Sequence, residues 1–149
     1  MIKRGGYGKK LFYRLGFWPT LLPKNSNKKR IWIQAVSVGE LSSINTLLQA
    51  FIADPKIEII LSGTTSTGQK IAEQKHAKDI LALGPFPLDW FPFSSLAWSR
   101  IQPDLAICVD SELWPEHMYQ AKKRGVPFFI VNARLSDRSF SRLSSLSIF

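Results

Sequence analysis

The sequence has little cysteine, no long apolar run and no acidic residue near its N-terminus. Its one cysteine, Cys108, cannot form a disulfide within the chain, and its apolar neighbours indicate a buried, reduced thiol of the kind found in cytoplasmic proteins. No stretch approaches the ~18 uninterrupted apolar residues of a transmembrane helix. The apolar patches near the N-terminus are broken by Lys, Arg and Gly, which argues against a secretory signal. These absences leave a chain of 149 residues, 45% hydrophobic, that suits one packed domain or part of a larger one.

The lack of acids near the N-terminus concentrates the net charge of +9 in one segment. Residues 1–30, here called the basic arm, hold nine Lys or Arg, whereas residues 31–149 hold eleven basic and eleven acidic residues. Five aromatic residues are interleaved with this charge: Tyr7, Phe12, Tyr13, Phe17 and Trp18. Such a segment can lie on an anionic membrane surface, bind nucleic acid, or pack its aromatic side chains against the domain. Composition leaves these three interpretations open.

Two kinds of apolar pattern alternate along the rest of the chain. Short apolar runs predict strands, at residues 31–36, 57–61, 80–83, 105–109 and 128–131. Apolar residues at helical spacing predict helices, at residues 41–52, 69–75, 94–101 and 114–124. The proline-rich residues 84–93 are predicted to be a loop. Alternating strands and helices, with several strands apolar throughout, predict an α/β fold with a doubly wound parallel sheet.

Polar clusters follow most of the predicted strands. Because ligands of open parallel sheets bind beyond the carboxyl ends of the strands, these clusters are candidate site residues. After the first two strands they comprise Ser37, Gly39, Glu40, Ser66, Thr67 and Gly68, and after the later strands Asp110, Glu112 and Arg134. Acid, hydroxyl and guanidinium groups are therefore expected at one edge of the sheet, which is what a cleft for sugars or phosphates needs.

The role of Glu40 has two interpretations. Ser37 and Glu40 fit the S-x-x-E capping box, in which the serine caps a helix and the glutamate reaches back to the serine amide. A carboxylate at the mouth of a strand–turn–helix unit is also well placed to accept a proton. This stretch alone favours the cap, since caps are far commoner than catalytic bases.

The other clusters have structural interpretations as well. The Thr- and Ser-rich turn at residues 63–68 suits helix capping and anion binding, but it lacks the lysine of a P-loop. Asp110 and Glu112 are a weak pair for Mg²⁺ and fit a solvated loop or a helix cap better. Arg134 is followed by an acid and a further arginine, as in a surface salt-bridge cluster. Neither histidine has cysteine or carboxylate partners at ligand spacing, so neither is assigned to a metal or to catalysis.

Several motifs occur together in a defined order. IWIQAVSVGE contains the first predicted strand, a Thr-rich turn ending in STG follows the second, and PLD occupies residues 87–89. DSELWP at residues 110–115 and VNARLSDRS at residues 131–139 complete the series. In this order and spacing the motifs resemble those of the N-terminal domain of the 3-deoxy-D-manno-octulosonic acid (Kdo) transferase family. The resemblance covers almost the whole chain, including RGGYGKKLFYRLGF in the basic arm.

The resemblance implies a GT-B fold, in which two Rossmann-like domains face each other across a cleft, with this chain as the acceptor-side half. It implies an inverting glycosyltransferase that needs no metal or other cofactor and moves Kdo from CMP-Kdo to a lipid A precursor in lipopolysaccharide synthesis. It further implies a peripheral protein at the cytoplasmic face of the bacterial inner membrane, with an anionic membrane surface and no nucleic acid among its partners.

The resemblance also assigns roles to individual residues. By position, Glu40 matches the general base of the SVGE motif, and Asp110 matches the first acid of E-x-E-L-W-P, which is thought to stabilise the transition state. The other residues at the strand exits are then expected to help bind the acceptor: Ser37, Gly39, Ser66, Thr67, Gly68, Glu112 and Arg134.

The sequence departs from the family pattern at several points. The family usually has Glu at the position of Asp110 and often His at that of Gln34, and the hydrophobic N-terminal anchor of many relatives is missing. The CMP-sugar domain is absent too. We therefore expect a basic arm (residues 1–30) and an acceptor-side domain (residues 31–149) of a truncated gene product or a fragment, inactive alone. Two alternatives stay open: a nucleic-acid-binding α/β domain that uses the basic arm, and a non-catalytic binder of lipid A.

Overall fold

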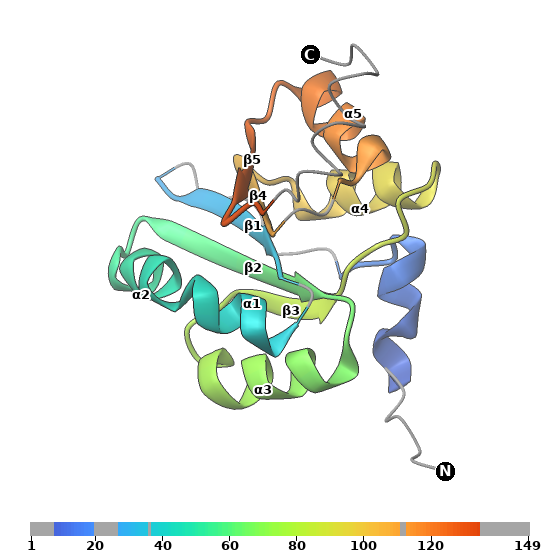
Figure 1. Ribbon diagram of the computed structural model, residues 1–149. Helices are drawn as coiled ribbons and strands as arrows, with labels where there is room; N and C mark the ends of the chain where they lie inside the picture. Colours follow the sequence, from blue (N-terminus) through green and yellow to red (C-terminus); the bar gives the residue numbers. More distant parts are fainter. Residues whose placement is uncertain (1–7, 20–26, 36, 111–112, 135–149) are drawn as a thin grey trace.

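A parallel sheet organises the part of the chain that the structure describes (Figure 1). The computed structural model describes residues 8–19, 27–35, 37–110 and 113–134. Within these ranges the strands are β1 (Lys29–Gln34), β2 (Ile57–Gly63), β3 (Ala82–Pro85), β4 (Leu105–Val109) and β5 (Phe128–Val131). The helices are the 3₁₀ helix η1 (Gly8–Leu15) and the α-helices α1 (Val38–Ser43), α2 (Asn45–Ala53), α3 (Ser66–His76), α4 (Phe93–Ile101) and α5 (Pro115–Arg124). None of these helices is long and apolar enough to cross a membrane.

The sheet is doubly wound, as the sequence predicts. Its strand order is β3-β2-β1-β4-β5, and all described neighbours are parallel. The central strand β1 pairs on both sides, so that Gln34 is level with Ser62 of β2 and with Cys108 of β4. Helices α1, α2 and α3 cover one face of the sheet, and α4 and α5 cover the other (Figure 1). This arrangement confirms a Rossmann-like α/β fold, the architecture of the N-terminal half of a GT-B enzyme.

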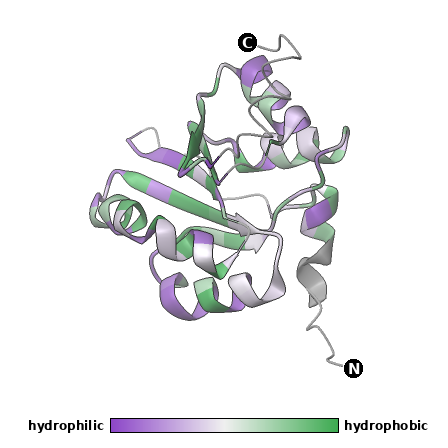
Figure 2. Ribbon diagram, viewed as in Figure 1, coloured by the Kyte–Doolittle hydropathy of each residue, from purple (hydrophilic) through white to green (hydrophobic). Residues whose placement is uncertain are grey.

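Alternating side chains of β1 build a core on each face of the sheet. Ile31 and Ile33 pack into an aliphatic cluster beneath α1, α2 and α3. Trp32 points to the opposite face, where its ring lies 5.3 Å from that of Trp98 and 5.7 Å from that of Phe86. Figure 2 shows the resulting pattern, with apolar strands inside and polar residues on the outer sides of the helices. The strands β1 and β4 are thus buried on both faces, whereas the apolar edge strand β5 exposes Phe129.

Part of the basic arm belongs to this fold. Trp18 is fully buried, and its ring lies 5.2 Å from that of Tyr13. Gly84 of β3 makes room for both, because a Cβ at this position would lie 2.5 Å from the ring of Tyr13. Phe12 and Phe17, in contrast, are 63% and 49% exposed. Within the described residues, the aromatic side chains of the arm therefore divide between core packing and exposure.

Most predicted boundaries differ from the structure by one to three residues, and three of the differences bear on the fold. The helix predicted over residues 41–52 is two helices, since the chain breaks at Ile44 (φ −102°, ψ 8°) and the hydroxyl of Ser43 donates to the carbonyl of Glu40 at 2.7 Å. Part of the predicted proline-rich loop is the edge strand β3, where a proline is tolerated. β1 begins at Lys29 rather than at residue 31, so Arg30 lies in the sheet.

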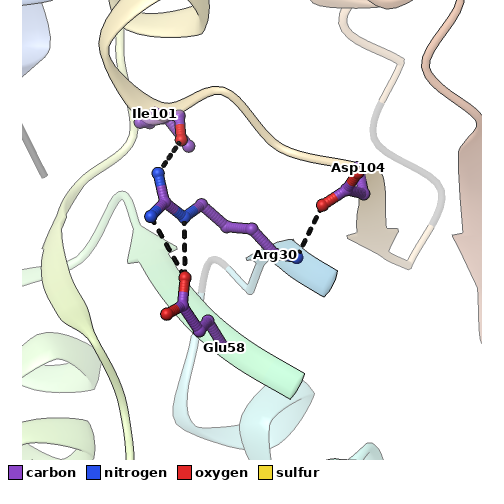
Figure 3. A network of polar contacts seen from close by, with 4 residues as sticks. All are labelled: Arg30, Glu58, Ile101 and Asp104. Carbon is purple, nitrogen blue, oxygen red and sulfur yellow. Dashed lines mark hydrogen bonds and ion pairs between the residues drawn. The ribbon is translucent and has the colours of Figure 1, made fainter. Parts of the chain in front are cut away.

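Arg30 is buried because its charge and donors are satisfied by three distant segments (Figure 3). Its side chain is 1% exposed, and its Nε and Nη2 donate to Oε2 of Glu58 at 3.2 and 3.1 Å. Its Nη1 donates to the carbonyl of Ile101 at 2.9 Å, and its backbone NH donates to Oδ2 of Asp104 at 2.8 Å. We call this network the Arg30 clasp. It joins β1, β2 and the end of α4 at the amino end of the sheet, so Arg30 does not contribute an accessible charge to the arm.

Candidate functional site

The carboxyl ends of β1 and β4 lie at a topological switch point. From β1 the chain passes through α1 and α2 to β2 on one side, whereas β4 and β5 lie on the other side. In open α/β sheets, ligands bind outside the strands at such a point. Glu40 follows β1 and Asp110 follows β4, so the structure places the two predicted catalytic carboxylates on either side of the switch point.

Ser37 and Glu40 form a local pair at the start of α1. Ser37 has an extended backbone, and its Oγ accepts a hydrogen bond from the backbone NH of Glu40 at 3.3 Å. The same hydroxyl donates to Oε1 of Glu40 at 3.0 Å. The capping role of Ser37 is therefore confirmed, and the half-buried carboxylate of Glu40 is oriented by the residue that caps its helix.

Gly39 leaves the start of α1 uncovered. The residue is exposed, and a Cβ built on it would meet nothing closer than Oγ of Ser37 at 3.8 Å. Packing among the described residues therefore does not require glycine here. What the missing side chain provides is close access to the backbone beside Glu40, and this is a property that a ligand can use.

The exit of β2 lies beside that of β1. Gly63 is at the end of β2, and a Cβ on it would lie 2.7 Å from the carbonyl oxygen of Ala35, so the two exits are in close contact. Thr65 caps α3, because its Oγ1 accepts from the backbone NH of Gly68 at 3.2 Å. Ser66 and Thr67 lie in the first turn of α3. The predicted capping by this turn is confirmed, with Thr65 as the cap.

The exits of β4 and β5 contain two residues with left-handed backbones. Asp110 has φ 68° and donates its backbone NH to the carbonyl of Val131 at 2.9 Å, and Asn132 has φ 55°. Asp and Asn tolerate this conformation better than most residues. Arg134 is exposed just beyond β5. Glu112, expected at the same edge, lies outside the described residues.

Two contacts join the loop at residues 84–93 to the start of α5. Asp89, in PLD, accepts a hydrogen bond at Oδ1 from the backbone NH of His117 at 2.9 Å and so satisfies a donor in the first turn of α5. Trp114, in DSELWP, packs on Phe86 with ring centroids 5.1 Å apart. Sequence reasoning missed this anchor, since Asp89 and His117 are 28 residues apart.

His117 is a neutral, structural residue in the aromatic core. The indole NH of Trp98 donates to its Nδ1 at 3.0 Å, and its Nε2 lies 3.3 Å from the carbonyl oxygen of Pro87. Nδ1 thus accepts, so the proton of the neutral ring is on Nε2. Burial lowers the pKa of His117 from 6.5 to about 4, against the opposing effect of Asp89. These contacts give His117 a role in holding the 84–93 loop, which precedes α4, against α5.

Comparisons with known proteins agree with the motifs. A family model described as 3-Deoxy-D-manno-octulosonic-acid transferase (kdotransferase) matches residues 9–149. A 3-deoxy-D-manno-octulosonic acid transferase of Haemophilus influenzae is 32% identical over 147 residues, 97% of this chain and 34% of the relative. One from Rickettsia bellii is 33% identical over 121 residues, 78% of this chain and 28% of the relative.

A differently named relative also matches. A bifunctional glycosyltransferase/methyltransferase of Fusobacterium nucleatum is 30% identical over 121 residues, 80% of this chain and 19% of the relative. The chain thus spans about a third or less of the length of these three relatives. The family match covers nearly the whole chain, and the fold is that expected of the N-terminal half of a GT-B enzyme. The chain belongs to the 3-deoxy-D-manno-octulosonic acid transferase family.

Proposed function

We propose that this chain is the acceptor-side part of a glycosyltransferase that moves Kdo from CMP-Kdo to a lipid A precursor in lipopolysaccharide synthesis. The observation that carries the proposal is the position of Glu40 and Asp110 after β1 and β4, on either side of the switch point where α/β sheets bind ligands. Family membership supports the nature of the donor and the acceptor.

Glu40 acts as the general base in this proposal. A sugar hydroxyl is a poor nucleophile at neutral pH, so a carboxylate must accept its proton as the new C–O bond forms. The Ser37 hydroxyl orients that carboxylate through its 3.0 Å hydrogen bond to Oε1. The acceptor oxygen attacks the anomeric carbon from the face opposite the cytidine monophosphate, which leaves with the electron pair of the broken bond, so a single displacement inverts that carbon. In this proposal, cationic groups or helix dipoles on the donor side balance the charge of the leaving group in place of a metal ion.

Asp110 has an electrostatic role in this proposal. Positive charge develops on a sugar ring as a glycosidic bond breaks, and a nearby carboxylate stabilises it. The backbone NH of Asp110 is fixed by its hydrogen bond to Val131 at 2.9 Å. The acceptor is proposed to bind at the N-terminal ends of α1 and α3, through Ser37, Gly39, Ser66, Thr67 and Gly68, and at Arg134. Glu112 belongs to the same proposed set.

The chain alone is proposed to be inactive. The donor has to be held in line with the acceptor hydroxyl, and such positioning supplies much of the rate of a two-substrate reaction. We assign donor binding to a second domain, as in other GT-B enzymes. Kdo transfer by the purified 149-residue chain at an ordinary enzymatic rate would contradict this division.

A chimera tests the proposed function. Residues 1–149 would replace the matching segment of the Haemophilus influenzae relative, which aligns with 97% of this chain. We expect the chimera to transfer Kdo from CMP-Kdo to a lipid A precursor. Glu40→Gln should lower turnover by at least ~10²-fold, since an amide cannot accept the proton. The melting temperature should stay nearly unchanged, because Gln can still accept a hydrogen bond from Ser37. If the chimera is active and its Glu40→Gln variant keeps full turnover, Glu40 is not the general base and its role is only to cap the helix.

The protein is proposed to act at an anionic membrane surface. The basic arm supplies positive charge. Four aromatic side chains are between 49% and 71% exposed: Phe12 on η1, Phe17 just after it, and Trp90 and Phe91 in the 84–93 loop. Aromatic and basic residues together suit the membrane interface. Flotation with anionic vesicles, beside a salt-dependent RNA or DNA shift assay, tests this: tight nucleic-acid binding without lipid preference would contradict it.

A further inference from the structure

A groove between α1 and α3 is separate from the strand exits. It has a volume of about 260 Å³ and lies on the face of the sheet covered by the first three α-helices. Its walls come from two segments that pack side by side (Figure 1), residues 38–45 and residues 71–76. Because Leu41 and Ser42 follow Glu40 directly on α1, the groove shares a wall with the helix that presents the proposed base.

The described polar side chains that line the groove are hydrogen-bond donors and include a cation but no acid. Ser42 and Asn45 line it from the α1 side, and Lys75 and His76 line it from α3. No carboxylate of the described residues lines it, and within the same residues no acid pairs with Lys75. Hydroxyl, amide, ammonium and imidazole groups can all donate hydrogen bonds to oxygen, and only the ammonium is always charged. This set suits an anionic ligand rich in oxygen.

His76 adds a mostly buried imidazole ring to the wall of the groove. The residue is only 8% exposed, yet its Nδ1 is buried and has no hydrogen-bond partner among the described residues. A buried polar atom of this kind is uncommon and destabilising unless a ligand or water satisfies it. The contrast with His117 is direct, because both ring nitrogens of His117 have partners in the described structure.

We propose that this groove is a binding site for a phosphate group, carried by a ligand whose remainder contacts the apolar side chains of Leu41 and Ile71. Lys75 supplies the charge, and Ser42, Asn45 and His76 supply hydrogen bonds to the phosphate oxygens. The inference depends on the contents of the groove and not on the proposed transfer reaction. If the reaction is as proposed, a phosphate held here would lie on the same helix as Glu40 and would position a phosphorylated substrate.

The test uses the side chains of the two histidines as built-in probes. The chain labelled with ¹⁵N is titrated with inorganic phosphate at pH 7.5, with sodium chloride holding the ionic strength constant because phosphate also screens charge. We expect a saturable shift of the His76 ring resonances, while those of His117, buried on the other face of the sheet, do not move. A second arm replaces phosphate with vesicles containing phosphatidic acid, against vesicles of phosphatidylcholine alone.

Variants of α3 identify the site. Lys75→Gln should weaken phosphate binding at least tenfold, whereas Lys70→Gln should leave it unchanged, because Lys70 is exposed on the same helix but does not line the groove. Unchanged backbone spectra establish that each variant is folded. A response to free phosphate supports a site for soluble phosphate compounds, and a response to phosphatidic acid alone supports a lipid headgroup. Absence of a saturable His76 shift in both arms, or equal losses in the two lysine variants, would overturn the proposal.

Discussion

At the start of α1, the residues that cap the helix are also the residues proposed to take part in the reaction. The hydroxyl of Ser37 accepts from the backbone NH of Glu40 and donates to its carboxylate, so one serine both starts α1 and orients the proposed base. Capping alone accounts for Ser37 and for the orientation of Glu40. It does not account for Gly39, which no described neighbour requires to be glycine.

Gly39→Ala should therefore separate binding from folding. A helical position gains up to about 1 kcal/mol from Gly to Ala, so we expect the melting temperature of the variant to be equal or higher. The Kdo transferase activity of the chimera should fall by at least tenfold, since the new methyl group would obstruct an acceptor beside Glu40. Gly63→Ala is the matched control, and it should lower stability because its Cβ would lie 2.7 Å from a carbonyl oxygen. Full activity of Gly39→Ala would remove the case for close approach of the acceptor.

His117 should make stability depend on pH. Its pKa is about 4 in the folded chain and near 6.5 when unfolded, so the unfolded chain binds more protons between these values. The free energy of unfolding should accordingly be highest above pH 6.5 and fall as the pH is lowered toward 4. At 1.36 kcal/mol per pKa unit, the loss from this residue is roughly 3 kcal/mol.

Urea unfolding at a series of pH values checks this. His117→Gln should show a weaker dependence between pH 6.5 and 4, although protonation of carboxylates contributes in both proteins. Equal slopes in the unaltered chain and His117→Gln would rule out His117 as the cause.

Among the elements, the Arg30 clasp should matter for stability and not for chemistry. Arg30→Met leaves the carboxylate of Glu58, which is 16% exposed, without its cation, and breaking one side of a fully buried ion pair costs about 3–5 kcal/mol, an upper bound here. We expect a loss of up to this size in urea unfolding. Adding Glu58→Leu should restore much of it, because an apolar pair of similar size is often as stable as a buried ion pair. Lys29→Met, whose side chain is 75% exposed, is the control and should change little. A small effect of Arg30→Met would show that the clasp is not a major source of stability.

Elements with purely local signals were predicted best. The predicted spans of β4 and β5, residues 105–109 and 128–131, match the structure residue for residue. Both are short apolar runs preceded by a proline or an acid, so their ends are marked in the sequence itself. The start of β1 was missed, because the partners that bury Arg30 are 28 and 74 residues away.

In the candidate site, too, contacts between residues close in the sequence could be predicted, whereas contacts between distant segments could not. Ser37 and Glu40 are three residues apart, so their pairing could be predicted from the capping-box spacing. The sequence predicts that a hydroxyl residue of the 63–68 turn caps α3. Which residue of this turn is the cap could not be predicted, and the structure identifies it as Thr65. The contact of Asp89 with α5 joins a loop to a helix 28 residues away, and no local pattern predicts it. Sequence motifs identified the family, whereas the fold explains why the motifs lie together.

For the molecule as a whole, the net charge and the proposed chemistry lie in different parts of the sequence, and the Arg30 clasp and the proposed chemistry lie at opposite ends of the sheet. The basic arm carries the net charge of +9, and the rest of the chain is balanced. One of its cations, Arg30, is withdrawn into the clasp at the amino end of the sheet. The proposed catalytic carboxylates follow β1 and β4 at the carboxyl end. Changes in the loops at the carboxyl end can therefore alter the chemistry without disturbing the clasp.

The clasp also has a consequence for the order of folding. Arg30 reaches Glu58 across 28 residues and Asp104 across 74, and closing the longer loop costs more chain entropy. We expect β1 and β2 to pair early and β4 to dock later. Pulse-labelled hydrogen exchange during refolding would detect this as protection of β2 amides before β4 amides, and simultaneous protection would contradict it. Because Glu40 follows β1 and Asp110 follows β4, a newly made chain would acquire half of its sheet before the two residues reach the same edge of it.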